Sequence, residues 1–244
     1  MSPSLRHSLI PTTLYAALAL SPLASAGFGN SFYLGPWTGG AYIKQATYSL
    51  AAPKVITNYD TSDSSLWIAI WVGVQQSADD VDNENLVQPL LNWCADQESC
   101  GCDASATEWC VTASTYTPEG QTGGAYVPVP KGAALDFEIS VNSSTSMIDQ
   151  KVWLNGELVS QQSDSKGMKP GVIYSANECS SSNCGTLASF SWTDVKLVMS
   201  KAVTDLDAYM SYDGASSDGL TSSDGGITWT ADAIAMGKDT TWDL

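Results

Sequence analysis

The chemistry of this chain has to come from carboxyl groups, because the side chains that most often assist them are almost absent. Its single His and single Arg are His7 and Arg6, and both lie in a segment typical of a secretion signal. The remainder has no imidazole for Ser-His-Asp or Cys-His catalysis or for a His-ligated metal site, and no guanidinium to clamp a phosphate. Acid–base chemistry here must use Asp or Glu, with Lys or Tyr as less favoured substitutes.

Two polar residues stand out because they fall within predicted apolar strands. Gln88 lies between Leu86 and Leu90 on one strand face. Glu178 shares a face with Tyr174, at the end of another predicted strand. A polar side chain in such a place needs hydrogen-bond partners if it is buried. The alternative is that each is an ordinary surface or strand-end residue.

The segment from Leu66 to Gln75 alternates in the way that a half-buried strand does. Its aliphatic residues predict a core face, and the opposite face carries Trp67, Trp71 and Gln75 with small residues between them. Such a face could line a cleft, or its two Trp rings could pack under a loop.

Residues 1–26 predict a signal peptide, which is cleaved after Ala26 and exports the protein. Arg6 supplies the positive start, an apolar stretch follows, and Ala24-Ser25-Ala26 fits a small-x-small cleavage site. All six cysteines follow it, so we expect disulfides formed in an oxidising compartment rather than a zinc site. Cys179 and Cys184 predict one pair. The other four, which allow three connectivities, are Cys94, Cys100, Cys102 and Cys110.

Short runs rich in Val, Ile, Trp, Tyr and Thr recur between turn residues, which is typical of an all-β sandwich or barrel. Pro89 predicts that its strand is an edge strand or contains a bulge. We expect residues 27–244 to form a single β-sandwich domain. The predicted strands are Ala41 to Leu50, Leu66 to Val74, Asn85 to Leu91, Trp109 to Tyr116, Ala134 to Val141, Gln150 to Leu154, Glu157 to Gln161, Val172 to Ala176, Ser189 to Met199 and Ile227 to Ile234.

These residues suggest a family. Trp71-Val72-Gly73, then Gln88 after an acidic segment, then Glu178 ahead of Phe190-Ser191-Trp192, resembles the secreted fungal glutamic peptidases, the eqolisins. The resemblance is distant and spans roughly Trp67 to Trp192, and uncharacterised secreted fungal proteins resemble the chain more closely. It implies a concanavalin-like jelly roll of two antiparallel sheets, which the disulfides would staple.

The resemblance also implies roles for the pair. Glu178 would be the general base that activates a water toward a peptide carbonyl, and the amide of Gln88 would stabilise the oxyanion. Trp67, Trp71, Gln75 and Tyr174 would bind the substrate. If the protein is an enzyme, it would then be an acid endopeptidase.

The competing hypothesis is a binding protein without catalysis. Sheets that carry several Trp residues also hold sugars against their aromatic faces. The same side chains would then form a polysaccharide or cell-wall site. A polysaccharide hydrolase or lyase comes third. Glycosidases need two carboxylates at set separations, and the sequence has no Glu-x-Asp-x-x-Glu run of the kind found in concanavalin-like glucanases.

Composition limits the partners. The formal charge of -16 repels nucleic acid and anionic lipid, so the expected partner is a polypeptide substrate or, alternatively, a polysaccharide. We expect a monomer without a metal or cofactor. The segment Asp79 to Glu84 is expected to be a solvated acidic loop, with calcium binding as its alternative.

Two further motifs predict local features. Asn142-Ser143-Ser144 is a glycosylation sequon, which would place Asn142 at the surface of a glycoprotein. Ser222 to Trp229 fits the pattern Ser-x-Asp-x-Gly-x-x-Trp, which resembles the Asp-box hairpin of secreted β proteins and is expected to be structural.

Overall fold

The computed structural model describes residues 26–77, 84–181 and 183–243. The predicted signal peptide, apart from its last residue, lies outside the described residues, and so does most of the acidic segment 79–84. In the described part, no helix is long and apolar enough to cross a membrane.

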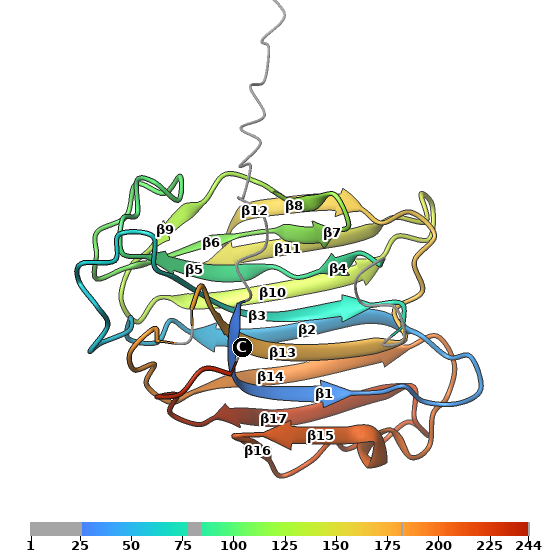
Figure 1. The fold of residues 1–244 in the computed structure, drawn as a ribbon. Coiled ribbons are helices and arrows are strands. Elements are labelled where there is room, and N and C mark those ends of the chain that lie inside the picture. Colours follow the sequence, from blue (N-terminus) through green and yellow to red (C-terminus); the bar gives the residue numbers. More distant parts are fainter. Residues whose placement is uncertain (1–25, 78–83, 182, 244) are drawn as a thin grey trace, which may run out of the picture.

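Two antiparallel sheets pack face to face (Figure 1). The ten-stranded sheet has the order β15-β1-β13-β3-β4-β7-β8, with β5 pairing β3 and β6, and β9 pairing β6. Its strands are β1 (Gly27–Leu34), β3 (Trp67–Gln75), β4 (Leu86–Val87), β5 (Leu90–Cys94), β6 (Trp109–Thr112), β7 (Ser114–Thr117), β8 (Gly120–Gly123), β9 (Val127–Val129), β13 (Val172–Cys179) and β15 (Met210–Asp213).

The seven-stranded sheet has the order β12-β11-β10-β2-β14-β17-β16. A short 3₁₀ helix, η1 (Leu206–Tyr209), precedes β15. The strands of this second sheet are β2 (Ile43–Ala51), β10 (Ala134–Val141), β11 (Ile148–Leu154), β12 (Glu157–Asp164), β14 (Phe190–Met199), β16 (Ala215–Ser217) and β17 (Thr228–Met236). The expected all-β sandwich of two antiparallel sheets is therefore confirmed.

The core lies between the sheets and follows the alternation of the strands. The even-numbered aliphatic residues of β3, from Ile68 to Val74, point into it. Across from them, the ring of Tyr48 stacks on Phe137 at 5.1 Å and meets Trp192 edge-on at 5.5 Å. Aromatic rings thus fill the middle of the sandwich.

Three disulfides cross-link the chain. The predicted Cys179–Cys184 bridge is present, and the structure settles the open connectivity as Cys94–Cys100 and Cys102–Cys110. Each bridge closes a loop next to a strand end of the ten-stranded sheet. The bridges therefore fix loops beside the sheet whose outer face carries the predicted site residues.

The Ser222 to Trp229 motif is structural, as expected. The Asp224 carboxylate accepts hydrogen bonds from the backbone N–H groups of Ile227 (3.1 Å) and Thr228 (2.8 Å). These bonds lower the pKa of Asp224. The Trp229 ring is buried, and its indole N–H donates to the backbone of Val203 and Gly226 at 3.2 Å each.

The prediction made from Pro89 is wrong, because the strand that contains Pro89 is neither an edge strand nor bulged. Val74 pairs with Val87 and Trp71 with Leu90, so equal numbers of residues intervene and the register continues unbroken. On the other side, β7 and β6 continue in one register in the same way. Strands β4 and β5 are thus one central strand, interrupted only where proline has no N–H to donate.

The core supplies the hydrogen bond that Pro89 cannot make. Gln88 N donates to Ser114 O at 2.8 Å on the β7 side. By the alternation of an antiparallel ladder, position 89 faces β3, where its partner would be the carbonyl of Val72. The hydroxyl of Tyr48, reaching across from the other sheet, donates to Val72 O at 3.0 Å. A buried phenol therefore replaces a ladder bond, and its burial raises the pKa of Tyr48.

This arrangement predicts the effect of Tyr48→Phe. The variant keeps the ring and leaves the Val72 carbonyl buried without a donor, so the free energy of unfolding should fall by about 1–3 kcal/mol. Urea denaturation of both proteins measures the difference. Tyr42→Phe is the matched control, because the Tyr42 hydroxyl has no hydrogen bond within the described residues. Equal stability of Tyr48→Phe and the parent protein would contradict the assignment.

Candidate functional site

Aromatic side chains that are not part of the core between the sheets cluster on the outer face of the ten-stranded sheet. We call this surface the aromatic face. The predicted alternation of β3 is confirmed: Trp67, Ala69 and Trp71 point outward, away from the core. The residues of the aromatic face that pack together are Trp67, Ala69, Trp71, Leu86, Leu90, Tyr116, Tyr126, Tyr174 and Ala176.

Trp71 lies at the centre of this face and is only 3% exposed. Its indole N–H donates to a carboxylate oxygen of Glu178 at 3.1 Å. Its ring meets that of Tyr174 edge-on, with centroids 5.3 Å apart. Register explains both contacts, because Trp71 pairs with Ala176, and the outward neighbours of Ala176 on β13 are Tyr174 and Glu178.

Tyr174 and Gln75 form a second contact pair. The phenol of Tyr174 donates to Gln75 Oε1 at 2.7 Å, and Gln75 Nε2 donates to the backbone oxygen of Glu84 at 3.2 Å. Burial is the main cause that raises the pKa of Tyr174. Tyr33 lies opposite Tyr174 on β1, with its ring centroid 6.0 Å away. The phenol of Tyr174 is thus held in its neutral form between two strands.

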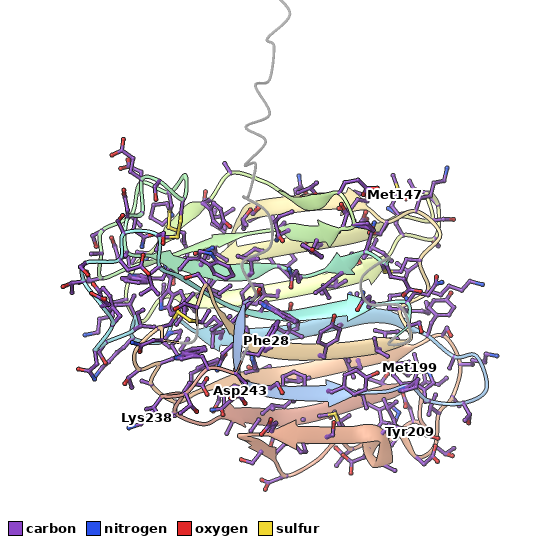
Figure 2. All side chains as sticks on the ribbon, viewed as in Figure 1. Phe28, Met147, Met199, Tyr209, Lys238 and Asp243 are labelled. Carbon is purple, nitrogen blue, oxygen red and sulfur yellow. A yellow bond between two sulfur atoms is a disulfide. The ribbon has the colours of Figure 1, made fainter. Side chains whose placement is uncertain are left out.

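Glu178 is a carboxyl group in an apolar setting. It pairs with Ala69 on β3 and with Phe28 on β1, whose ring is 47% exposed (Figure 2). Burial raises the pKa of Glu178, and the hydrogen bond from Trp71 partly offsets this rise. The protonated form is therefore favoured over a wider pH range than in an exposed glutamate.

Gln88 lies on the same face, on the other side of β3. Register places it opposite Gly73, where an added Cβ would lie 3.0 Å from Gln88 Cβ and 2.6 Å from a methyl carbon of Leu86. The missing side chain at Gly73 thus lets β4 pack closely. Gln88 is 5% exposed, and its Oε1 has no hydrogen-bond partner within the described chain.

The register holds the two candidate catalytic residues apart. Glu178 is level with Ala69 and Gln88 is level with Gly73, four residues further along β3. Strand geometry puts their Cα atoms about 10 Å apart across the sheet and about 13 Å apart along it. Both side chains share the aromatic face, and Trp71 occupies the position between them. Their catalytic roles stay a prediction.

Sequence reasoning missed several members of this face. Tyr116 pairs with Leu86 and therefore points outward, and Tyr126, which precedes β9, packs against the same cluster. Asn92 lies opposite Ala69. The alternation within β5 and β7 could have indicated Asn92 and Tyr116, whereas Tyr126 lies in a connection that carries no such pattern.

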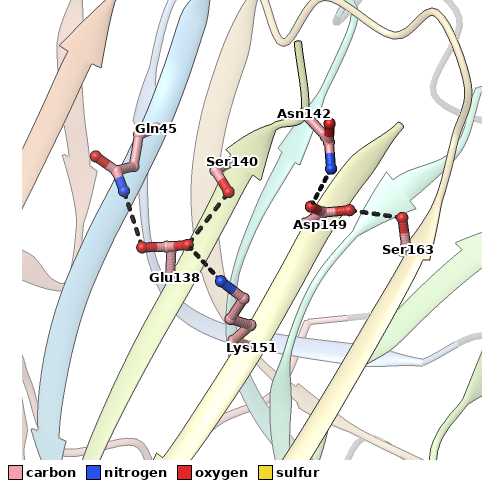
Figure 3. A network of polar contacts seen from close by, with 7 residues as sticks. All are labelled: Gln45, Glu138, Ser140, Asn142, Asp149, Lys151 and Ser163. Atoms are coloured by element: carbon pink, nitrogen blue, oxygen red, sulfur yellow. Dashed lines mark hydrogen bonds and ion pairs between the residues drawn. The ribbon is translucent and has the colours of Figure 1, made fainter. Parts of the chain in front are cut away.

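The outer face of the seven-stranded sheet is different, because polar groups cover much of it, although Trp153 and Leu158 pair with each other there. Glu138 accepts hydrogen bonds from Gln45 (2.8 Å) and Ser140 (3.3 Å) and pairs with Lys151 at 3.3 Å (Figure 3). A second group joins Asn142, Asp149 and Ser163, and there the Asn142 amide donates to Asp149 at 2.8 Å. The predicted glycosylation site thus lies at the end of this polar sheet, and its modification stays a prediction.

Two cavities lie away from the aromatic face. One of about 20 Å³ is enclosed within the apolar core near Tyr48 and Trp192, and another lies beside β16 and β17. In the parts of the chain that are described, no cluster of His, Cys, Asp or Glu has the form of a metal site.

Comparisons with known proteins leave the function open. No family model matches the chain, and no curated protein matches it. Matching solved structures include Bacillus licheniformis β-glucanase, which is 9% identical with a TM-score of 0.32 over 83% of this chain and 67% of that chain.

The matches also include peanut lectin, which is 12% identical with a TM-score of 0.31 over 88% of this chain and 83% of that chain. A third is sheep galectin-11 in complex with glycerol, which is 7% identical with a TM-score of 0.30 over 65% of this chain and 92% of that chain. The resemblance to glutamic peptidases therefore stays a prediction.

Proposed function

We propose that this protein binds carbohydrate on its aromatic face. The observation that carries the proposal is the contrast between the two outer faces of the sandwich. A sheet face that only meets water is expected to be mainly polar, as that of the seven-stranded sheet is around Glu138 and Asp149. The ten-stranded sheet instead turns Trp and Tyr rings outward in a contiguous cluster.

The chemistry of this face fits a sugar. Aromatic rings offer flat apolar surfaces with a polar edge, and Trp and Tyr are favoured where a ligand is apolar on one side and hydroxylated on the other. Binding sites commonly combine such rings with a few polar groups that fix orientation. Asn92, Gln88 and Glu178 supply amides and a carboxyl group on this face.

Charge narrows the ligand class. The formal charge of -16 disfavours anionic polysaccharides at neutral pH. The one ion pair among the described residues, Lys151 with Glu138, lies on the opposite sheet. We therefore propose an uncharged polysaccharide as the ligand. The three disulfides fit folding in an oxidising compartment, which agrees with an exported cell-wall or glycan-binding protein.

A pair of Trp variants tests the proposal. Trp67 is a partly buried member of the aromatic face, and Trp153 is a partly buried Trp on the opposite outer face. Trp67→Ala should weaken binding to a neutral polysaccharide by roughly tenfold, because it removes an aromatic contact surface. Trp153→Ala should leave binding unchanged.

Pull-down with insoluble β-glucan, cellulose, mannan and chitin measures this, with unfolding curves confirming that both variants are folded. If binding is unchanged in Trp67→Ala but lost in Trp153→Ala, the aromatic face is not the binding surface.

The second candidate function is the acid endopeptidase implied by the family resemblance. The observation in its favour is the buried carboxyl of Glu178, whose pKa is raised and whose one hydrogen-bond donor among the described residues is Trp71. A general base and its oxyanion donor must both lie within reach of one carbonyl group. The register separation of Gln88 and Glu178 therefore favours binding over proteolysis.

Denatured casein at pH 3 to 5 separates the two functions. We expect no cleavage by the parent protein, because the register does not bring the amide and carboxyl groups together. Glu178→Gln and Gln88→Ala should then behave like the parent protein in this assay. Proteolysis by the parent protein that both variants abolish would establish the peptidase instead.

The raised pKa of Glu178 also predicts a pH dependence of stability. The folded state retains the proton above pH 4.5, the ordinary value, whereas the unfolded chain releases it there. The contribution of Glu178 is therefore most favourable below pH 4.5 and is lost as the pH rises through the higher folded-state pKa.

Glu178→Gln cannot ionise, so its free energy of unfolding relative to that of the parent protein should rise across this window and then level off. Urea denaturation at several pH values measures the difference. A difference that does not change with pH would show that the Glu178 pKa is not raised by folding.

A further inference from the structure

Residues 237–243, which follow β17, lie outside the strands, and we call them the terminal segment. Asp239 exchanges two backbone hydrogen bonds of 3.0 Å with Leu187, in the connection between β13 and β14. Asp243 exchanges two more with Phe28 of β1, at 2.6 and 2.9 Å (Figure 2). Backbone hydrogen bonds at these two points therefore attach the terminal segment to the body of the protein.

The side chain of Asp239 makes a further attachment, and it is buried. Asp239 is 4% exposed, and its carboxyl group accepts hydrogen bonds from the backbone N–H of Asn30 at 2.9 Å and from the side-chain amide of Asn177. An added Cβ at Gly29 would lie 2.7 Å from that carboxyl carbon, so the glycine lets the carboxyl group reach β1. The carboxyl group thus joins the terminal segment to β1 and β13 at once.

The amide of Asn177 lacks one bond. Asn177 is fully buried opposite Ile70, on the core side of β13, and its Oδ1 has no hydrogen-bond partner within the described residues. An ionised carboxyl group only accepts hydrogen bonds, whereas a protonated one also has an O–H to donate. A carboxylic acid and a primary amide can therefore exchange two hydrogen bonds. Because a buried acceptor without a donor is destabilising, the neutral form of Asp239 suits Asn177 better than the charged form.

The charged groups around Asp239 do not favour its ionised form. Burial is the first cause that raises the pKa of Asp239, Asp213 of β15 adds to it, and the two hydrogen bonds partly offset the rise. Lys238 is exposed and forms no ion pair within the described residues. The other charged residues on the segments that contact Asp239 are Glu178, which points to the opposite face of β13, and the exposed Asp243.

We propose that Asn177 and Asp239 form a proton-linked latch, which fastens the terminal segment to the ten-stranded sheet in acid and loosens it as the pH rises. In acid, neutral Asp239 exchanges two hydrogen bonds with Asn177. At higher pH, the carboxylate leaves the Asn177 oxygen unpaired and lies buried near Asp213. The attachment is therefore strongest below pH 3.8, the ordinary pKa of Asp, and is lost as the pH rises through the higher folded-state pKa.

The terminal segment also borders the aromatic face. It pairs with Phe28, which in turn pairs with Glu178 and is 47% exposed. Loosening of the segment at high pH would therefore release the strand end beside Glu178, whichever ligand the aromatic face binds.

Asp239→Asn tests the latch, because Asn cannot ionise and can still exchange two hydrogen bonds with the amide of Asn177. Hydrogen exchange followed by mass spectrometry, corrected for the intrinsic rate at each pH, measures the protection of the terminal segment relative to that of β3. In the parent protein this relative protection should fall severalfold from pH 4 to pH 8, and in Asp239→Asn it should stay constant. Equal pH dependence in both proteins, or none in the parent protein, would overturn the inference.

Variants of three other carboxyl groups supply the controls. Asp213→Asn removes the neighbouring charge, so its loss of protection should be smaller than that of the parent protein. Asp232→Asn, at an exposed position of β17, should reproduce the parent profile, and so should Glu178→Gln, which removes another carboxyl group with a raised pKa.

If Glu178→Gln instead abolishes the pH dependence, Glu178 is the group that titrates and the inference is wrong. Should Asp239→Asn not fold, the comparison of the parent protein with Asp213→Asn still decides, because equal losses of protection in these two proteins would overturn the latch.

Discussion

The structure depends on a single central strand that is buried on both faces. Every residue of β3 after Trp67 is buried, with aliphatic side chains on one side and Trp71, Gly73 and Gln75 on the other. The aliphatic side faces the second sheet, which accounts for its burial. The other side looks away from the core, so its burial has to come from the neighbouring side chains of the aromatic face.

That requirement shapes the aromatic face. Gly73 lets Leu86 approach β3, and Trp71 packs against Tyr174 and bonds Glu178. The result combines the Glu178 carboxyl, whose pKa is raised, with a buried Gln88 Oε1 that has no hydrogen-bond partner in the described structure. Neither of these polar groups is expected to stabilise the fold. Residues that do not favour stability are concentrated at the sites where proteins bind ligands. The polar network around Glu138, on the other sheet, shows no such departure.

Much of the fold follows from the sequence because alternation and turn chemistry are local. The strands predicted from Val, Ile and aromatic runs are present, and the outward residues of β3 were identified correctly. The strand β1, with its sequence GFGNSFYL, was missed because Gly, Asn and Ser obscure its alternation. The short strands β8, β9, β15 and β16 were missed too, because three or four residues give too little pattern to recognise.

The arrangement of the site could not be predicted, because register between distant strands is not encoded in any one segment. The family resemblance implied that Gln88 and Glu178 act on one carbonyl group, whereas pairing through β3 sets them four residues apart. The prediction of an edge or bulged strand at Pro89 failed for a related reason: the hydrogen bond that Pro89 cannot donate is replaced by one from Tyr48, a residue of the other sheet. Such compensation is visible only when both sheets are in place.

The most direct test of the account is an NMR titration of ¹⁵N-labelled protein with a soluble neutral oligosaccharide. The indole N–H signals of Trp67 and Trp71 and the side-chain amide of Gln88 report on the aromatic face, and the indole of Trp153 reports on the opposite sheet. Carbohydrate binding as proposed shifts the first three signals and leaves that of Trp153 in place. Shifts confined to Trp153 and the polar sheet, or none at saturating ligand, would contradict it.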